Sequence, residues 1–211
     1  MVKIRPRQRI DTQKRRIDMK SFKELVKENR SCRRFDNSHQ IDTQTLTELV
    51  DLARQAASAG NKQPLKYILS TDKLKNEEIF SCLGWAAYLT DWKGPKEKEQ
   101  PSGYIVVMGD HTVADNFWCD HGIAAQTILL GAREQGLAGC MFASINIKKL
   151  KGFLTIEDHL EVKLVIALGK PIETIQIDEI DEGGDIKYFR DENQVHHVPK
   201  RKLSNLIVST W

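Results

Sequence analysis

This sequence has no long apolar run and no paired cysteines. No window approaches the roughly eighteen unbroken apolar residues that a membrane-spanning helix needs, and the first ten residues, MVKIRPRQRI, lack the apolar stretch of a secretory signal. Its cysteines are scattered without a CxxC pair, which argues against a disulfide framework and a four-thiolate zinc site: Cys32, Cys82, Cys119 and Cys140. These absences predict a cytoplasmic protein with free thiols.

Two common nucleotide-binding motifs are also missing. No GxGxxG segment follows an expected strand, which disfavours a Rossmann domain, and no GxxxxGK segment followed by Ser or Thr is present to form a P-loop. The sequence has no internal repeat either. A phosphate-bearing ligand would therefore need another kind of site.

The composition indicates one globular domain preceded by a basic arm. Of 211 residues, 40% are hydrophobic and 29% are charged, which is enough apolar material for a sizeable core. The net charge of +3 is uneven, because cations crowd residues 1–19 and only Asp11 and Asp18 oppose them. We expect residues 1–19 to be a flexible arm and residues 20–211 to be the folded domain.

The basic arm has two interpretations. Clustered cations gain free energy on a phosphate backbone by releasing counterions, so a nucleic-acid contact is one of them. However, the arm has no aromatic platform and no helix-turn-helix pattern, and few apolar residues could order it. A solvated tail, or a chain that starts at Met19, is the favoured interpretation.

Helical hydrophobic spacing occurs in four segments: one beginning at Ser21, residues 42–57, residues 114–135 and residues 146–154. Ser21 can form a capping box with Glu24, and Asp42 or Thr43 can cap the second segment. The third segment is apolar over a wide arc, so we expect it to be buried on several sides.

Strands are expected between these helices. Apolar runs of buried-strand length begin at Tyr67, Tyr104 and Val162, and a glycine-rich turn is expected from Gly136. The mixed order of helices and strands predicts an α+β sandwich or a layered α/β domain.

Three arginines and a serine follow the first expected helix. Arg30, Ser31, Arg33 and Arg34 stand in the segment NRSCRRF, residues 29–35. A guanidinium matches the oxygens of a phosphate and stays charged at any working pH, so this segment suits a phosphomonoester. Cations near a helix C-terminus also offset the helix dipole, and the sequence leaves a solvated basic turn open as the alternative.

Two further segments can contribute to a ligand site. Residues 58–64, SAGNKQP, combine small residues that let the backbone approach a flat ligand with amides that can pair with a ring, although an ordinary turn has the same composition. Far along the chain, Lys200, Arg201 and Lys202 form a second cationic cluster. The two cationic clusters can converge on one phosphate.

Together these segments resemble the nitroreductase family, in which an R-x-S-x-R/K motif, an S-x-x-N-x-Q-P loop and a basic C-terminal segment surround FMN. The matching segments are Arg30-Ser31-Cys32-Arg33, residues 58–64 and Pro199-Lys200-Arg201. The resemblance continues in residues 120–126, 136–140 and 167–171, and it covers the chain from Phe22 onward. The departures are Asn29, where many members carry a further Arg, and Leu65, where many carry an aromatic residue.

The resemblance implies an α+β layered fold with a central, mostly antiparallel sheet flanked by helices. It also implies a domain-swapped homodimer with FMN at the subunit interface. The apolar helix over residues 114–135 suits such an interface, although an internal core helix has the same pattern.

The resemblance also assigns ligand roles. It assigns the FMN phosphate to Arg30, Ser31, Lys200 and Arg201, and the pyrimidine edge of the flavin or the ribityl-phosphate to Arg33, while the role of Arg34 stays open. The remaining assignments concern the ring and the ribityl chain. They are Ser58 and Asn61, Gln63 from the partner subunit, and the backbone near flavin N5 at Cys140, Met141, Ala143 and Ser144.

The implied activity is an FMN-dependent oxidoreductase with NADH or NADPH as co-substrate. In this cycle the nicotinamide gives hydride to flavin N5 and leaves, and a small acceptor such as a nitroaromatic or a quinone then takes it in a ping-pong mechanism. A cation beside N1 and O2 and a backbone donor at N5 support this chemistry without a dedicated protein acid or base. A flavin-binding sensor or carrier with little turnover, and a specialised reaction such as dehalogenation or thiazoline oxidation, are the alternatives.

Some residues allow other interpretations. A zinc site is conceivable from Cys119, Asp120, His121, His196 and His197, but Cys119 and His121 are two apart on an expected helix and do not share a face. Cys140 lacks a positioned base that would make it a nucleophile. An aromatic cluster is expected to form either a lid over a substrate cleft or part of the core: Trp85, Tyr88 and Trp92.

Overall fold

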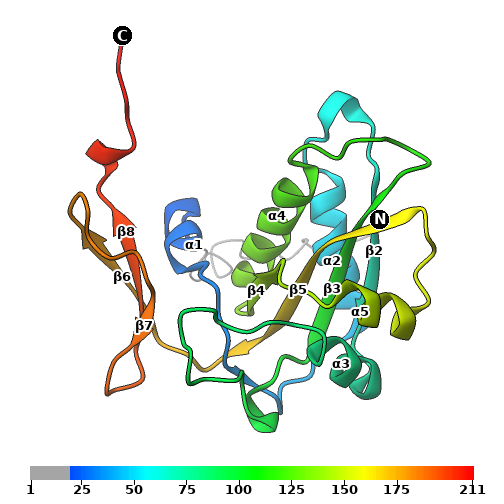
Figure 1. The fold of residues 1–211 in the computed structure, drawn as a ribbon, viewed down its shortest axis with the longest axis horizontal. Helices are drawn as coiled ribbons and strands as arrows, with labels where there is room; N and C mark the ends of the chain where they lie inside the picture. Colours follow the sequence, from blue (N-terminus) through cyan, green and yellow to red (C-terminus); the bar gives the residue numbers. More distant parts are fainter. Residues whose placement is uncertain (1–19) are drawn as a thin grey trace, which may run out of the picture.

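A computed structural model describes residues 20–211 of the chain (Figure 1). The expected basic arm, residues 1–19, lies outside the described residues. The described part forms two sheets, one of five strands and one of three.

The five-stranded sheet is antiparallel throughout. Its order is β1-β5-β3-β2, with β4 also pairing with β5. The strand bounds are β1 Phe35–Asp36, β2 Leu65–Ser70, β3 Gly103–Asp110, β4 Ala138–Phe142 and β5 Leu160–Pro171. Every residue of β3 is buried, as expected for a central strand covered on both faces. The predicted mostly antiparallel sheet is confirmed.

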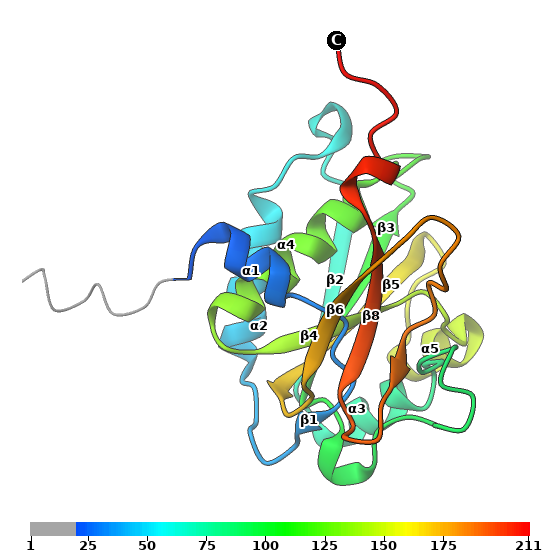
Figure 2. The ribbon, with the colours of Figure 1, turned by 90° about the vertical axis from the view of Figure 1, so that its left-hand side faces the viewer.

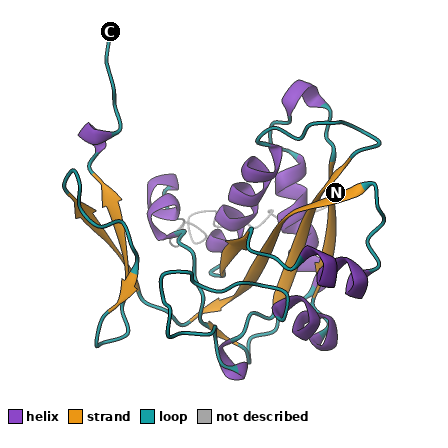
Figure 3. Cartoon of the chain, in the orientation of Figure 1, coloured by secondary structure: helices purple, strands orange, loops and turns teal. Residues whose placement is uncertain are grey.

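Helices cover both faces of this sheet. Their bounds are α1 Phe22–Glu28, α2 Thr43–Arg54, α3 Lys73–Phe80, α4 Asp120–Glu134 and α5 Ile147–Leu154, with short 3₁₀ turns η2 Ala59–Asn61, η3 Glu97–Glu99 and η4 Leu203–Asn205. Figure 3 shows α2 and α4 on one side of the strands and α3 and α5 on the other. The predicted layered α+β architecture is therefore confirmed.

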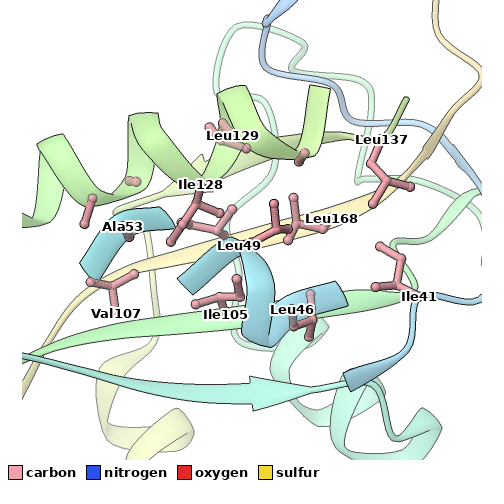
Figure 4. Packing of buried hydrophobic residues seen from close by; sticks show 14 residues of the cluster. Ile41, Leu46, Leu49, Ala53, Ile105, Val107, Ile128, Leu129, Leu137 and Leu168 are labelled. Atoms are coloured by element: carbon pink, nitrogen blue, oxygen red, sulfur yellow. The ribbon is translucent and has the colours of Figure 1, made fainter. Parts of the chain in front are cut away.

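Two hydrophobic cores follow from the alternation of side chains along β3. Ile105 and Val107 face α2 and α4, where Leu49 and Ile128 pack against them (Figure 4). Val106 and its neighbours on the other face pack against residues of α3, β4 and α5. Alternate strand residues point to opposite faces, so one strand supplies both cores.

The capping predictions hold at both of the first helices. Ser21 and Glu24 form the capping box of α1, and the Asp42 side chain accepts a hydrogen bond from Thr45 N at the start of α2. At the end of α4, Gly136 takes φ +74°, a left-handed conformation that glycine adopts without steric cost. The predicted turn is therefore confirmed at Gly136, and the residues beyond it, 138–142, form β4.

Some expected bounds are wrong. Helix α4 begins at Asp120 and not at residue 114, because the Asp110 and Asn116 side chains accept hydrogen bonds from Thr112 N and Trp118 N. Such local turns compete with helix formation. Helix α2 ends at Arg54, before the expected end at residue 57. Helix α3 was not expected, since its sequence buries only Asn76 and Ile79.

The three-stranded sheet lies beside α1 at the edge of the molecule (Figures 1 and 2). It consists of β6 Ile175–Ile180, β7 Phe189–Arg190 and β8 His196–Arg201, in the order β6-β8-β7. After β8 the chain makes the η4 turn and extends away from the folded body (Figure 1). Within residues 20–211, no helix combines the length and the apolar character needed to cross a bilayer.

Candidate functional site

A pocket of about 280 Å³ opens where the chain leaves α1, beside β4, α4 and the three-stranded sheet. We call it the cation pocket. Five predicted site residues line it: Arg30, Ser31, Arg33, Met141 and Lys200. The structure thus brings the two cationic clusters of the sequence to one place.

Arg30 is held at the C-terminal end of α1. Its Nε donates to the Asn29 carbonyl oxygen at 2.6 Å and its Nη2 to the Val26 carbonyl oxygen at 2.8 Å. These carbonyls have no partner within the helix, so Arg30 satisfies them as a capping side chain does. Burial lowers the pKa of Arg30. Arg30 therefore does both things that the sequence allowed: it caps the end of α1 and it lines the cation pocket.

The segment after Arg30 runs beside β4. Cys32 N donates to the Gly139 carbonyl oxygen at 3.0 Å, and Ser31 pairs with Gly139 as an isolated parallel bridge. The Cys32 side chain points into the interior, and its burial raises the pKa of its thiol to about 12. This contact holds the Arg-Ser segment at the rim of the cation pocket.

Arg33 is almost fully buried in the same pocket. Its backbone N–H donates to Glu173 Oε2 at 2.8 Å, and its Nη1 lies 3.3 Å from the Ser31 carbonyl oxygen. The same Nη1 lies 3.2 Å from His196 Nε2. The guanidinium carbon also lies 4.6 Å from the centre of the Tyr188 ring, a distance at which a cation is attracted by the aromatic face.

Lys200 lies on β8 and is exposed. Within residues 20–211 its side chain makes no hydrogen bond or ion pair, whereas that of Lys202, two residues on, pairs with Asp181. Arg201 is exposed at the end of β8 and does not line the cation pocket. Of the basic C-terminal cluster, the structure brings only Lys200 to Arg33.

The Ser58 loop forms a separate pocket of about 160 Å³, which we call the amide pocket. Ser58 Oγ donates to Asp120 Oδ2 at 2.6 Å and accepts from Gln63 N at 2.9 Å, so the loop is fixed to the first residue of α4. Asn61 and Gln63 both take positive φ, 54° and 52°. The Gln63 side chain donates to Asn61 Oδ1 at 3.2 Å, and both residues are exposed.

The two pockets lie on different sides of α4. Ala124 lines the amide pocket and Gln126 lines the cation pocket, and residues two apart on a helix point in different directions. Within one chain, Ser58 and Gln63 are therefore not in the pocket that holds Arg33. The resemblance implied FMN at an interface between two subunits, with Gln63 from the partner subunit, and that arrangement stays a prediction.

The residues assigned to the backbone near flavin N5 lie in β4 and directly after it. Cys140 is buried, Met141 is partly exposed in the cation pocket, and Ala143 and Ser144 are exposed after the strand. The Ser144 carbonyl oxygen accepts from Gly84 N at 2.8 Å. Burial raises the pKa of the Cys140 thiol, which argues against its use as a nucleophile.

The three aromatic residues expected to form either a lid or part of the core do not all take the same role. The Trp85 ring packs 4.6 Å from Phe142 and belongs to the core. Tyr88 is about half exposed, and its ring lies 4.9 Å from Tyr188 at the cation pocket. Trp92 lies 4.3 Å from the guanidinium carbon of Arg190. Tyr88 is the one of the three that contacts a residue of the pocket.

The described residues offer no cluster of side chains that would support the zinc interpretation. Within residues 20–211, no group of three or more His, Cys, Asp or Glu side chains is placed to hold an ion. His197 pairs with Asp178 at 2.7 Å, while His196 faces Arg33. Arg34, whose role was open, forms an ion pair with Glu99 at 2.7 Å.

Sequence reasoning missed several residues of the cation pocket: Asn29, Gln126, Leu129, Tyr188, His196 and Val198. It also missed Glu173, whose side chain is fully buried and bonds to Arg190 at 2.6 Å. Asn29 and Val198 stand next to motif residues, and His196 lies just before the basic C-terminal cluster. No local signal marks Glu173 or Tyr188, because their partners are distant in the chain.

Comparison with known proteins shows the family of this chain. The profile of the Nitroreductase family matches residues 26–170. The "Putative NAD(P)H nitroreductase MhqN" of Bacillus subtilis is 28% identical over 185 residues, covering 72% of this chain and 89% of that protein. The 4-nitrobenzoate reductase of Pseudomonas putida is 24% identical over 206 residues, covering 75% of this chain and 89% of that protein.

Solved structures share the fold. A nitroreductase family protein from Clostridium novyi NT is 26% identical, with a TM-score of 0.58 over 72% of this chain and 86% of that chain. A "putative nitroreductase in complex with FMN" from Exiguobacterium sibiricum 255-15 is 17% identical, with a TM-score of 0.62 over 74% of this chain and 90% of that chain. The chain therefore belongs to the nitroreductase family and is an oxidoreductase of that family.

Proposed function

We propose that this protein binds FMN in the cation pocket and passes hydride from NADH or NADPH to a small acceptor. The observation that carries the proposal is the convergence of Arg33 and Lys200, which lie far apart in sequence, on one pocket that Ser31 and Met141 also line. The solved relative in complex with FMN supports the cofactor. The name of the Bacillus subtilis relative supports NAD(P)H as the donor.

The residues present fit a flavin mononucleotide. Lys200 has no partner within residues 20–211, and the Nε and Nη2 groups of Arg33 make no hydrogen bond there, so donors remain for an anionic and acceptor-rich ligand. Lys200 would hold the phosphate as a point charge, and Arg33 would meet the acceptors of the pyrimidine edge. The bound flavin would supply hydride exchange at N5. The protein would orient it and would balance, through Arg33, the negative charge gained on reduction.

We propose further that the complete site forms in a homodimer. One chain separates the Ser58 loop from the cation pocket, so Gln63 and Asn61 would reach the flavin of a partner subunit. Exposed apolar side chains are available for such an interface on α4, on β4 and in the chain after β8: Ile123, Met141, Leu203, Leu206, Ile207, Val208 and Trp211. Exchange of the C-terminal segment between subunits would cover the last five of these.

The first test is the visible absorption spectrum of the purified full chain, followed by anaerobic addition of NADH and, separately, NADPH. We expect flavin bands that bleach rapidly with at least one donor and return when a nitroaromatic or quinone acceptor is added. A colourless protein that cannot be loaded with FMN would refute the cofactor. Full FMN occupancy with negligible bleaching by either donor would refute the enzyme and favour a flavin carrier.

A matched pair of variants tests the pocket. Lys200→Ala removes a cation without a protein partner, whereas Lys202→Ala removes one that already pairs with Asp181. A charge-assisted hydrogen bond contributes about 1.5 to 3 kcal/mol, so Lys200→Ala should raise the FMN dissociation constant at least about tenfold. Lys202→Ala should leave it within about twofold. Equal effects of the two variants would place the phosphate elsewhere.

A further inference from the structure

Arg33 is contacted by residues that lie beyond the family match, Glu173 at its backbone and Tyr188 and His196 at its guanidinium. The match ends at residue 170, while Glu173, Tyr188 and His196 all follow it. Tyr188 and His196 come from the three-stranded sheet region and line the cation pocket with Arg33. The contacts of Arg33 with this region therefore join the main sheet to the C-terminal one.

The contact between Arg33 and His196 fixes the state of the histidine. A guanidinium has donors and no acceptor, so a hydrogen bond across the 3.2 Å between Nη1 and Nε2 requires a lone pair on His196 Nε2. His196 is therefore neutral, with its proton on Nδ1. Its side chain is fully buried, and Nδ1 has no partner within residues 20–211.

Tyr188 restrains the same guanidinium from its flat face. Its ring centre lies 4.6 Å from the Arg33 guanidinium carbon and 5.3 Å from the His196 ring centre. Its hydroxyl accepts from Tyr88 N at 3.4 Å, which ties the ring to the loop that carries Tyr88. Arg33 is thus restrained in its plane by His196 and across its plane by Tyr188.

These contacts use one edge of the guanidinium and leave the other available. Nη1 faces two acceptors, the Ser31 carbonyl oxygen and His196 Nε2. Nε and Nη2 make no hydrogen bond within residues 20–211 and form the edge of the fork that remains. Such an edge matches two acceptors in one plane, which the pyrimidine edge of a flavin presents at N1 and O2.

We propose that His196 and Tyr188 are positioning residues that hold Arg33 with its Nε–Nη2 edge turned toward the flavin pyrimidine ring. This inference rests on the proposed function and deepens it, because it names the residues that orient Arg33. Preorganised donors act without the cost of reorienting at the moment of reaction. Loss of the restraint would weaken FMN binding and make the flavin harder to reduce.

The test compares five substitutions in the full chain. His196→Leu removes the acceptor, and His196→Gln restores one through its amide oxygen. His197→Leu is the matched control, because His197 lies on the same strand and pairs with Asp178 and Asp191 instead of Arg33. Tyr188→Phe keeps the ring and should behave like the wild type, whereas Tyr188→Leu should resemble His196→Leu.

The first readout is the ¹⁵N–¹H spectrum of the arginine side chains in the protein before FMN is added. Restricted rotation should give resolved Arg33 Nη signals in the wild type, His196→Gln and His197→Leu, and these signals should broaden or vanish in His196→Leu. Unchanged Arg33 signals in His196→Leu would overturn the inference, whether or not the protein binds FMN.

The second readout is FMN binding together with the midpoint potential of the bound flavin. A hydrogen bond to a charged group is strong enough that His196→Leu should raise the FMN dissociation constant about tenfold. It should also shift the potential to more negative values, and His196→Gln should restore both. If the wild type binds FMN tightly and His196→Leu has the same dissociation constant and midpoint potential, the inference is overturned and the proposed function stands. Failure of the wild type to bind FMN would overturn the proposed function.

Discussion

Buried charges at single positions determine how the cation pocket is built. The Glu173 side chain is completely buried; its Oε2 accepts from Arg33 N at 2.8 Å and its Oε1 from Arg190 Nη2 at 2.6 Å. Arg190 in turn lies over Trp92. Removing one partner of a buried pair leaves the other charge without compensation, so this carboxylate should matter more than any surface ion pair.

Glu173→Gln should lower the free energy of unfolding by about 3 kcal/mol, because Arg190 would keep its buried charge and lose its counter-ion. Asp51→Asn provides the control, since it removes an exposed ion pair with Arg54, which solvent screens, and should change the same quantity far less. Urea titrations of the two variants beside the wild type give the comparison. Similar losses for both would show that Glu173 is compensated by other contacts.

His196 should make stability depend on pH. Burial lowers the pKa of His196 from 6.5 to about 4 in the folded chain. Between these values the unfolded chain binds a proton that the folded chain does not, so stability should fall as the pH drops from 6.5 toward 4, by on the order of 3 kcal/mol. Urea titrations between pH 4.5 and 6 measure this slope. The slope of the unfolding free energy against pH counts the protons taken up on unfolding, so in His196→Gln it should be smaller by nearly one proton. An equal slope in the variant and the wild type would show that other groups cause the pH dependence.

At the scale of elements, the contact between the segment after α1 and β4 sets the rim of the cation pocket. β4 can lie close to β5 because position 139 has no side chain. A Cβ there would stand 2.6 Å from the Ala167 carbonyl oxygen and 2.6 Å from Leu129 Cδ2. Backbone atoms cannot give way as a side-chain tip can, so this position requires glycine.

Gly139→Ala should therefore destabilise the fold by about 1 to 3 kcal/mol through overpacking. Gly122→Ala on α4 is the control, because a Cβ there would meet nothing within 4 Å, and alanine is the better helix former by up to about 1 kcal/mol. Thermal and urea unfolding should move in opposite directions for the two variants. A stability for Gly139→Ala equal to that of the wild type would show that β4 can shift without cost.

At the scale of the whole molecule, the C-terminal segment has an apolar surface that nothing in the described part of one chain covers. Leu206, Val208 and Trp211 are strongly exposed after β8, where the chain extends from the body (Figure 1). Exposed apolar side chains gathered in one segment are typical of an interface. In the proposed homodimer, these side chains would be buried against the partner subunit.

Deletion of residues 203–211 should raise the dimer dissociation constant at least about tenfold, since burying one large apolar side chain contributes about 1.5 to 3 kcal/mol. Sedimentation equilibrium measures this directly. Leu74→Ser on α3 removes a side chain of similar exposure outside the proposed interface and should leave the constant unchanged. A wild-type chain that stays monomeric at all concentrations would contradict the proposal.

Local chemistry in the sequence was sufficient to predict much of the fold. The cap residues Ser21 and Asp42, the strand from Tyr104 and the turn at Gly136 were predicted because their signals lie within a few residues of one another. The Arg-Ser motif and the basic C-terminal cluster also pointed to a shared ligand from residue types alone. Helix α3 was missed because it has almost no apolar stripe.

The tertiary structure alone decided which of these residues meet. It placed Lys200 but not Arg201 in the cation pocket, it set Ser58 and Gln63 on the other side of α4, and it surrounded Arg33 with Tyr188 and His196. It also buried Glu173, whose partners are distant in the chain. The physical reason is that side-chain type and spacing determine local conformation, whereas burial and pairing between distant residues depend on how the elements pack.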